Sequence, residues 1–221
     1  MQEIKVENDK FPKIDSNYHC VVHGQKRLNG VAICSRFPIT SYQIGFSGER
    51  DESRFIYTMI DDIHIINVYV PLGDNYSYRF EYKMFFYREL LNFLSKFNLK
   101  KDKVILCGDM NVAYSNLDVW DEKEWDGKVV FLPEEKAMIN NILNLGFIDI
   151  IREFYKNERI YTFYDYRGAK VYKNEGLRLD YIFISPNLIE SVVDIEILTK
   201  IRRKRKPTPS DHVPVILELK G

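Results

Sequence analysis

Short runs rich in β-branched and aromatic residues recur along the whole chain and predict a fold dominated by strands. Each run has the length of a strand rather than that of a helix. The runs comprise residues 30–34, 55–60, 63–70, 104–107, 180–184, 192–198 and 213–219. Only Asp61 and Asp62 separate the second run from the third, so we expect these two runs to form a hairpin with an acidic turn.

Two stretches have helical period instead. Apolar residues between Tyr82 and Phe97 recur every three or four positions, which predicts a long helix with one buried face. A second helix is predicted to begin at Pro133 and to end before Gly146. This mixture predicts a layered α/β fold with many antiparallel contacts. A doubly wound nucleotide-binding fold is disfavoured because no Gly-rich phosphate loop follows any strand.

Composition narrows the function classes further. The 221 residues contain 32 Lys and Arg against 32 Asp and Glu, so a contact with a polyanion must come from a local patch rather than from net charge. No apolar run has the length of a membrane span, and the start resembles no signal peptide. The three cysteines form no metal-binding pair, so we expect reduced thiols in a cytoplasmic protein. Residues 1–221 contain no evident linker and are expected to form one domain.

The segment Gly108-Asp109-Met110-Asn111 is the sharpest chemical feature of the sequence. It follows the apolar run 104–107, so it lies where a buried strand is predicted to end. Residues two apart in an extended chain point the same way, which sets the Asp109 carboxylate beside the Asn111 amide. Such a pair suits proton transfer at the rim of a sheet, and an Asx turn that ends the strand accounts for the same residues equally well.

A histidine and a second acid form another candidate pair. His212 opens the run 213–219, and histidine is the side chain whose charge changes most readily near neutral pH. An isolated histidine is nevertheless more often structural. Asp180 leads into the run 180–184 and has two interpretations: it orients His212 as the acid of a His–Asp pair does, or it forms an ion pair with Arg178.

The ends of the chain hold two further candidates. Glu3 offers the oxygen ligand that Mg²⁺ prefers, although a Glu in such a place is commonly just solvated. The basic run from Lys200 to Lys206 lies shortly before His212. A charge run is usually a solvated loop, and the sharper alternative is a surface that contacts a phosphate backbone.

Taken together and in order, these segments resemble the exonuclease III family of abasic-site endonucleases, within the endonuclease/exonuclease/phosphatase superfamily. The resemblance runs along almost the whole chain. Its main motifs are Gln2-Glu3-Ile-Lys5, Asn67-Val-Tyr-Val-Pro71, Gly108-Asp-Met-Asn111, Gly176-Leu-Arg-Leu-Asp-Tyr181 and Ser210-Asp-His212. Each motif is weak alone, and their common order makes the resemblance specific.

The resemblance implies a fold, an activity and a substrate. The fold would be a DNase I-like layered α/β sandwich in which two mainly antiparallel sheets are flanked by helices. The activity would be that of a DNA repair phosphodiesterase that uses Mg²⁺, with Mn²⁺ as an alternative ion. Its substrate would be double-stranded DNA, cleaved at abasic sites and from 3′ ends by a monomer that does not contact membranes.

Individual roles also follow from the resemblance. The implied catalytic residues are Asp109, Asn111, His212, Asp180 and Tyr69. The implied metal ligands are Glu3 and Asp211. The implied DNA contacts are Gly24, Gln25, Lys26, Asn174, Phe163, Arg202, Arg203, Lys204 and Arg205.

Two departures from the family pattern keep alternatives open. The family carries a strand with a Trp-Asn pair and a helix before its first motif, and here Met1 directly precedes Gln2, so we expect that strand and helix to be lacking. Leu177 stands where some members carry Trp. The alternatives are an inactive remnant and a superfamily phosphoesterase with a substrate other than DNA. The aromatic stretch from Tyr161 to Arg167 and the basic run favour DNA.

Overall fold

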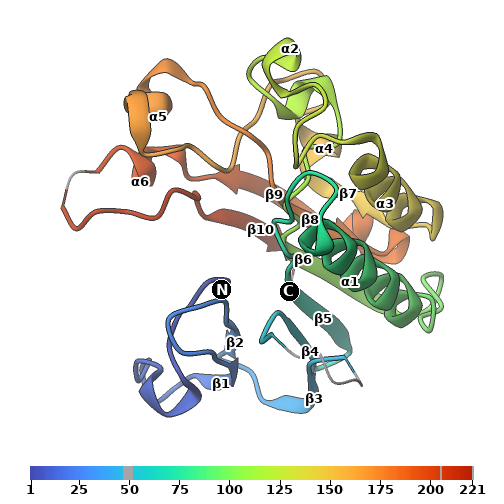
Figure 1. The fold of residues 1–221 in the computed structure, drawn as a ribbon. Helices are drawn as coiled ribbons and strands as arrows, with labels where there is room; N and C mark the ends of the chain where they lie inside the picture. The colour runs from blue at the N-terminus through green and yellow to red at the C-terminus, as the bar shows by residue number, and fades with distance from the viewer. Residues whose placement is uncertain (47–51, 205, 221) are drawn as a thin grey trace.

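The computed structural model of the chain describes residues 1–46, 52–204 and 206–220 (Figure 1). Its strands are β1 (His19–His23), β2 (Val31–Ser35), β3 (Ile39–Ile44), β4 (Phe55–Ile60), β5 (Ile63–Tyr69), β6 (Lys103–Asp109), β7 (Ile148–Asp149), β8 (Asp180–Ile184), β9 (Val192–Ile197) and β10 (Val215–Leu219). Its α-helices are α1 (Tyr78–Leu94), α2 (Glu122–Trp125), α3 (Pro133–Asn144), α4 (Ile150–Phe154), α5 (Lys170–Lys173) and α6 (Thr199–Arg202).

Six strands form the main sheet in the order β3-β4-β5-β6-β8-β7. Strands β4 and β5 pair antiparallel around Asp61 and Asp62, so the predicted hairpin with an acidic turn is confirmed. Strands β5 and β6 are parallel, and α1 lies in the connection between them. A parallel pair needs such a long connection because its two strands begin at the same edge of the sheet.

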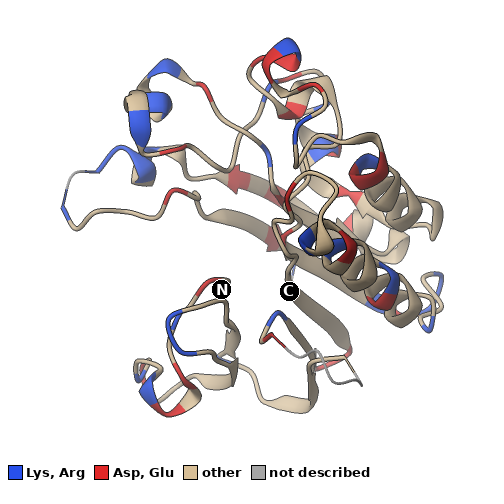
Figure 2. Cartoon of the chain, in the orientation of Figure 1, with Lys and Arg blue, Asp and Glu red and all other residues tan. Residues whose placement is uncertain are grey.

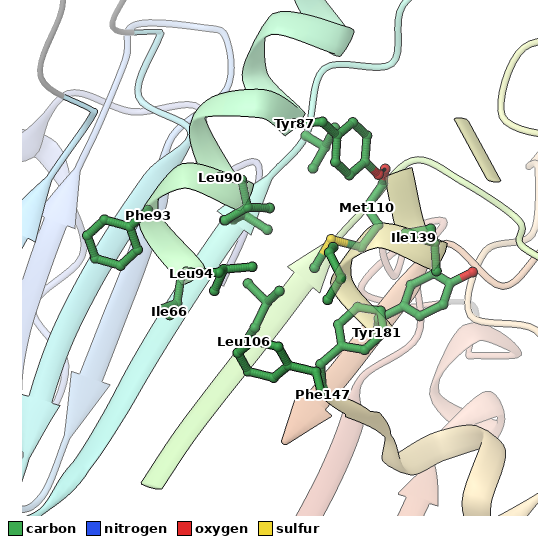
Figure 3. Packing of buried hydrophobic residues seen from close by; sticks show 14 of the residues in the cluster. Ile66, Tyr87, Leu90, Phe93, Leu94, Leu106, Met110, Ile139, Phe147 and Tyr181 are labelled. Carbon is green, nitrogen blue, oxygen red and sulfur yellow. Dashed lines mark hydrogen bonds between the residues drawn. The ribbon is translucent and has the colours of Figure 1, made fainter. Parts of the chain in front are cut away.

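The alternation of side chains along each strand gives the sheet two apolar faces. In β6, Val104 and Leu106 join the cluster covered by α1 and α3, whereas Ile105 and Cys107 face the opposite side. Figure 3 shows Leu90 and Leu94 of α1 packed toward Leu106 and Met110 in this larger cluster. Packing under the helices therefore holds β5, β6 and β8 in place on one face of the sheet. The opposite face and the strand ends can then carry polar side chains.

The opposite face of the sheet meets a second layer of strands. This layer consists of two antiparallel pairs, β1–β2 and β9–β10 (Figure 1). The β9–β10 pair packs through Ile195 and Leu217 against Ile182 of β8. In the other pair, Nδ1 of His23 lies 3.3 Å from the carbonyl oxygen of Phe55 in β4. The expected layered arrangement of two strand systems with flanking helices is thus observed.

The cysteine prediction is wrong for two of the three residues. Cys20 and Cys34 form a disulfide between β1 and β2, and Cys107 is a free thiol. The two residues stand directly opposite each other in the antiparallel register, which brings their Cα atoms within 4.1 Å. Sequence spacing could not reveal this pairing because it depends on the register of strand β1, which we did not predict.

Most other predicted elements have the expected positions. The runs 55–60 and 180–184 are strands with those bounds, and the two predicted helices correspond to α1 and α3. The strands β1, β3 and β7 were missed; β3 is mostly exposed and β7 has only two residues, so neither carries a strong apolar pattern. Within the described ranges, no helix has the length and apolar character needed to cross a membrane.

Candidate active site

Three polar side chains stand in one row across the main sheet. Tyr69 ends β5, Asp109 ends β6 beside it, and Asp180 begins β8 on the other side of Asp109. Because the three residues are register partners, their side chains point to the same face, toward the strand pairs. The sequence predicted each residue separately, and the register brings the three together.

Gly108 sets the approach of β6 to β5 just before this row. Its φ is 134°, and a Cβ atom at this position would lie 2.0 Å from the carbonyl oxygen of Val68. A side chain therefore cannot be accommodated without moving a backbone that is paired in the parallel register. The glycine of the Gly108–Asn111 motif is thus needed for strand packing, while the acid after it is available for chemistry.

Asp109 is a buried carboxyl group with an unusual proton affinity. Burial raises the pKa of Asp109 to about 7, with the neighbouring Asp180 adding to the rise and His212 opposing it. Oδ1 of Asp109 accepts a hydrogen bond of 2.8 Å from the backbone N–H of Asn111. A carboxyl group with this pKa gains and loses its proton near neutral pH, as a general acid or base must.

His212 faces both acids of the row. Its Nδ1 lies 2.8 Å from Oδ2 of Asp180, and its Nε2 lies 3.9 Å from Oδ2 of Asp109. Burial lowers the pKa of His212, but the charge of Asp180, the hydrogen bond to it and the charge of Asp109 together raise that pKa to about 10. The imidazole is therefore protonated at neutral pH, and of the two interpretations of Asp180 the pair with His212 is the one observed.

Arg178 does not compete for Asp180. Its buried guanidinium lies 2.6 Å from Asp118 and 2.6 Å from Asp149. Thr162 holds the chain next to it, because its hydroxyl accepts hydrogen bonds from the backbone N–H groups of Leu179 and Asp180. The start of β8 is thus fixed from both sides, with the Asp180 carboxylate directed to His212.

Glu3 completes the cluster from the second strand layer. One ligand atom each from Glu3, Asp109 and His212 lies within 4.8 Å of the others. Burial is the largest cause that raises the pKa of Tyr69, and the charges of Glu3 and Asp109 raise this pKa further. Tyr69 is therefore a neutral phenol. Two carboxylates at this spacing form an oxygen donor set that fits a hard divalent cation.

Asp211 and Asn111 lie beside the group of Glu3, Asp109 and His212 and are not part of it. Both Asp211 and Glu3 line the cavity, but Glu3 is grouped with Asp109 and His212 rather than with Asp211. Asn111 is buried behind the row, where its side-chain amide donates a 2.8 Å hydrogen bond to the carbonyl oxygen of Val70. Asn111 therefore connects the ends of β5 and β6 through its hydrogen bonds to Val70 and Asp109.

A cavity of about 860 Å³ opens over the cluster. Its polar lining residues include Glu3, Asp109, Asp180, Asp211 and His212. Cys107, Ile182 and Val215 line a further part, between the main sheet and β10. The cavity is large enough for a substrate group, and the acids and the imidazole face that group together.

Known proteins are similar to this chain over almost its whole length. The model of the endonuclease/exonuclease/phosphatase family matches residues 1–212. An exodeoxyribonuclease III from Haemophilus influenzae is 34% identical over 100% of this chain and 88% of its own length. The chain belongs to the endonuclease/exonuclease/phosphatase family.

Solved structures of family members support the same assignment. An AP endonuclease from Archaeoglobus fulgidus is 38% identical and superposes with a TM-score of 0.93 over 99% of this chain and 87% of that protein. A 3′–5′ exonuclease from Neisseria meningitidis is 32% identical, with a TM-score of 0.93 over 100% of this chain and 88% of that protein. The predicted layered α/β fold of this family is confirmed.

The other predicted residues lie outside the polar cluster. Phe163 is half-buried and meets the His212 ring edge-on, with centroids 5.1 Å apart. Gly24, Gln25 and Lys26 lie in the turn between β1 and β2, where Lys26 is exposed. Asn174 is an exposed residue that ends α5 and accepts a hydrogen bond from the Tyr164 hydroxyl.

The basic run divides into buried and exposed members. Arg202 is only 8% exposed, its guanidinium stacks on the Tyr166 ring at 4.4 Å, and it donates to the carbonyl oxygen of Tyr164. Arg202 therefore offers little surface to a phosphate backbone, because its guanidinium packs on the Tyr166 ring. Arg203 and Lys204 are exposed, and Arg205 lies outside the described residues.

Figure 2 shows further basic residues beside this segment, on α5, which contains Lys170 and Lys173. Sequence reasoning also missed Arg54, whose guanidinium stacks on the Tyr69 ring at 4.6 Å and donates to the Tyr69 carbonyl oxygen. Arg54 carries no motif signal of its own. Its position immediately before the predicted strand 55–60, in the hairpin that leads to Tyr69, was the available hint.

Proposed function

We propose that this family member is a DNA repair phosphodiesterase that hydrolyses the backbone at abasic sites and removes groups from 3′ ends, with Mg²⁺ as its cofactor. The observation that carries the proposal is the convergence of Glu3, Asp109 and His212 at the floor of one cavity. The names of similar proteins, exodeoxyribonuclease III, AP endonuclease and a 3′ phosphatase bound to product DNA hairpin, give the substrate class.

Asp109 and His212 have complementary proton states in this proposal. With a pKa of about 7, Asp109 accepts a proton from a water molecule that attacks phosphorus. With a pKa of about 10, His212 stays protonated and donates a hydrogen bond to a non-bridging phosphate oxygen, where negative charge develops. Asp180 holds the imidazole in the orientation that this donation requires.

Glu3 and Asp109 are the residues that would hold the cation. When bound, Mg²⁺ neutralises phosphate charge and polarises the P–O bond. Tyr69 remains protonated next to them, so its hydroxyl can donate to a phosphate oxygen in the same region. The chain is proposed to act on DNA as a monomer.

The DNA surface would lie around the cavity. Phe163 forms a wall beside His212 suited to an extruded sugar that lacks a base, since extrusion is easiest where no base is stacked. Lys26, Asn174, Arg203 and Lys204 are exposed and would contact backbone phosphates. Gly24 and Gln25 would present backbone and amide groups to the same backbone.

The decisive experiment compares three substrates with the same preparation of the native chain. A duplex with one abasic site tests endonuclease activity, a duplex with a 3′-phosphate tests end cleaning, and a small aryl phosphodiester tests the alternative substrate class. Each reaction is run with Mg²⁺, with Mn²⁺ and with excess EDTA. Sedimentation velocity on the same preparation reports the oligomeric state.

We expect cleavage of the two DNA substrates with either cation, little turnover of the small ester, and no turnover in EDTA. Preferred hydrolysis of the small ester would assign the site to a non-DNA phosphoesterase. No turnover of any substrate by a folded, metal-loaded protein would establish the inactive alternative. Full cleavage of abasic DNA in EDTA would remove the cation from the proposal.

A further inference from the structure

Three consecutive carbonyl groups behind the active site each accept a hydrogen bond from a buried side chain. The Tyr87 hydroxyl donates to Met110 O at 2.6 Å, the Lys83 ammonium to Asn111 O at 2.7 Å, and the Tyr181 hydroxyl to Val112 O at 2.9 Å. Figure 3 shows Tyr87 on its helix above Met110. The segment after β6 is thus held at every residue from Met110 to Val112.

Lys83 is the unusual member of this set because it brings a charge into the core. Its side chain is fully buried, and its ammonium also donates to Leu72 O at 3.1 Å and to Oε1 of Glu135 at 2.5 Å. The other Glu135 oxygen accepts a 3.0 Å bond from the backbone N–H of Leu132, where α3 begins. All three ammonium protons therefore have partners on three different segments.

Stability alone does not account for a buried pair of this kind. Two apolar side chains of similar volume commonly stabilise a core as well as, or better than, a buried ion pair does. What the Lys83–Glu135 pair adds is a fixed donor, aimed at one carbonyl of the segment that carries Asn111. The pair links α1 and α3 to that segment in a single geometry.

The held segment is directly connected to the chemistry. Asn111 has a φ of 48°, in the left-handed region, and its N–H donates to Oδ1 of Asp109. The peptide that carries this N–H also carries the Met110 carbonyl, which Tyr87 holds, and Lys83 holds the next peptide through the Asn111 carbonyl. If the peptide between Met110 and Asn111 turned, the Asp109 carboxylate would lose this bond and change its direction. The donors to the peptides on both sides of Asn111 therefore also fix the orientation of the group proposed to accept the proton.

We propose that Lys83 and Tyr87, with Glu135 as the counter-ion of Lys83, are positioning residues that hold Asn111 and thereby aim the Asp109 carboxylate. The inference rests on the proposed phosphodiesterase function of the same site. It predicts that the clamp acts on turnover and leaves DNA binding unchanged, because none of its members reaches the cavity lining.

The main variant is the double substitution Lys83→Met with Glu135→Gln. It removes both charges together, so neither is left buried without a partner, while volume is nearly conserved. We expect kcat to fall about 10- to 100-fold, as for other groups that orient active-site ligands, with KM for abasic DNA changed less than twofold. The measurement is steady-state kinetics corrected for the folded fraction.

Tyr87→Phe changes no charge, so it cannot destabilise the fold by leaving a buried charge without a partner. It deletes one hydroxyl and leaves the ring packed, so we expect kcat to fall about 2- to 10-fold, the value of one net hydrogen bond. Phe93→Leu is the matched control. Phe93 lies on the same helix and is buried, but its ring packs on Phe55 of β4, with centroids 4.9 Å apart, and it donates nothing to the segment, so the helix is destabilised while kcat per folded molecule stays native.

Amide hydrogen exchange followed by mass spectrometry tests the clamp without any activity. Peptides that contain residues 110–113 should exchange at least tenfold faster in the double variant and measurably faster in Tyr87→Phe, while peptides of β4 stay native. Phe93→Leu should show no such local increase. A native chain that cleaves no DNA would defeat the proposed function, yet these exchange rates would still decide the clamp.

Native kcat in both the double variant and Tyr87→Phe would overturn the inference, as would unchanged exchange in residues 110–113. A rise of KM at constant kcat would also overturn it, because that pattern belongs to a binding surface. If the double variant does not fold, Tyr87→Phe and its exchange rates carry the test alone.

Discussion

The two halves of the active site are held in place by different means. Tyr69, Asp109 and Asp180 are register partners in adjacent strands of the main sheet. Glu3 and His212 stand on irregular segments of the second layer, tied by contacts such as the backbone bonds of Ile4 to Gly30 and of Val213 to Thr162. The first half is therefore as rigid as the sheet, whereas the second follows the position of a few loops.

This difference suggests that the two halves of the site have different functions. A group whose direction must not change during proton transfer belongs on a rigid element. A group that is proposed only to hold the cation can stand on a loop. Asp109 is in the rigid half, while Glu3, with a φ of 50°, is in the adjustable half. Variants in the two halves should consequently differ in kind as well as in size.

The largest effects are expected where the two halves meet. Asp109→Asn removes the proposed base and His212→Ala removes the proposed phosphate donor, so each should lower kcat by ~10²–10⁴. Binding of abasic DNA should stay near native. Single-turnover kinetics and a binding titration give the two quantities. Asp62→Asn, an exposed acid at the opposite end of the hairpin, is the control. Wild-type turnover in either variant would remove that residue from the mechanism.

Glu3→Gln tests the adjustable half by itself. The neutral amide keeps the shape and weakens attraction for a cation, so we expect the Mg²⁺ concentration for half-maximal rate to rise about 10- to 100-fold. Rate at saturating Mg²⁺ should largely recover, which would not happen for Asp109→Asn. A Mg²⁺ titration of activity measures this, and an unchanged midpoint would exclude Glu3 as a ligand.

The pH profile separates the two titrating groups. Asp109 accepts a proton only when ionised, so with its pKa of about 7 the rate should rise by up to about tenfold per pH unit below neutrality. His212 donates only when protonated, so with its pKa of about 10 the rate should fall only in strong alkali. Initial rates from about pH 5 to pH 11 measure both limbs. His212→Ala should lose the alkaline limb, and a native alkaline limb in that variant would show that another group causes it.

The smallest effect concerns the exposed basic surface. Replacing Arg203 and Lys204 by Ala removes two proposed phosphate contacts, and each lost contact should lower the slope of log affinity against log salt by about one unit. kcat at saturating DNA should not change. Replacing Lys100 and Lys101, which are exposed just before β6 begins, removes the same charge far from the cavity and is the control. Equal slopes for both double variants and the native chain would identify residues 203 and 204 as a solvated loop.

Local patterns alone indicated Asp109 and Asp180 as candidates in the rigid half of the site. Asp109 and Asp180 adjoin apolar runs, and a strand that ends in a polar residue at the rim of a sheet is visible in a single segment of sequence. The family resemblance supplied the order of the motifs and the roles of Tyr69 and Glu3. Which side chains face each other then follows from the strand register alone.

Features that join distant segments could not be predicted in this way. Lys83 and Glu135 look like ordinary charged positions on two amphipathic helices, and only the packing of α1 against α3 makes them a buried pair. The sequence places Arg202 in an exposed basic run, and only the tertiary structure shows that its guanidinium packs on the Tyr166 ring. Pairing of Cys20 with Cys34 required the register of a strand that carried no clear pattern.

Gly108 has a consequence for how activity should be read in any preparation of this chain. It is the residue of β6 that faces Val68, where no Cβ atom fits. A slip of β6 by one position would bring Cys107 or Asp109 to that place and would also turn the acid to the helix-covered face. Misaligned chains are therefore excluded sterically and chemically at the same point. Specific activity is thus proportional to the fraction of molecules in which β5 and β6 pair in the correct register. A measurement of helix content or compactness does not distinguish these molecules from misaligned ones.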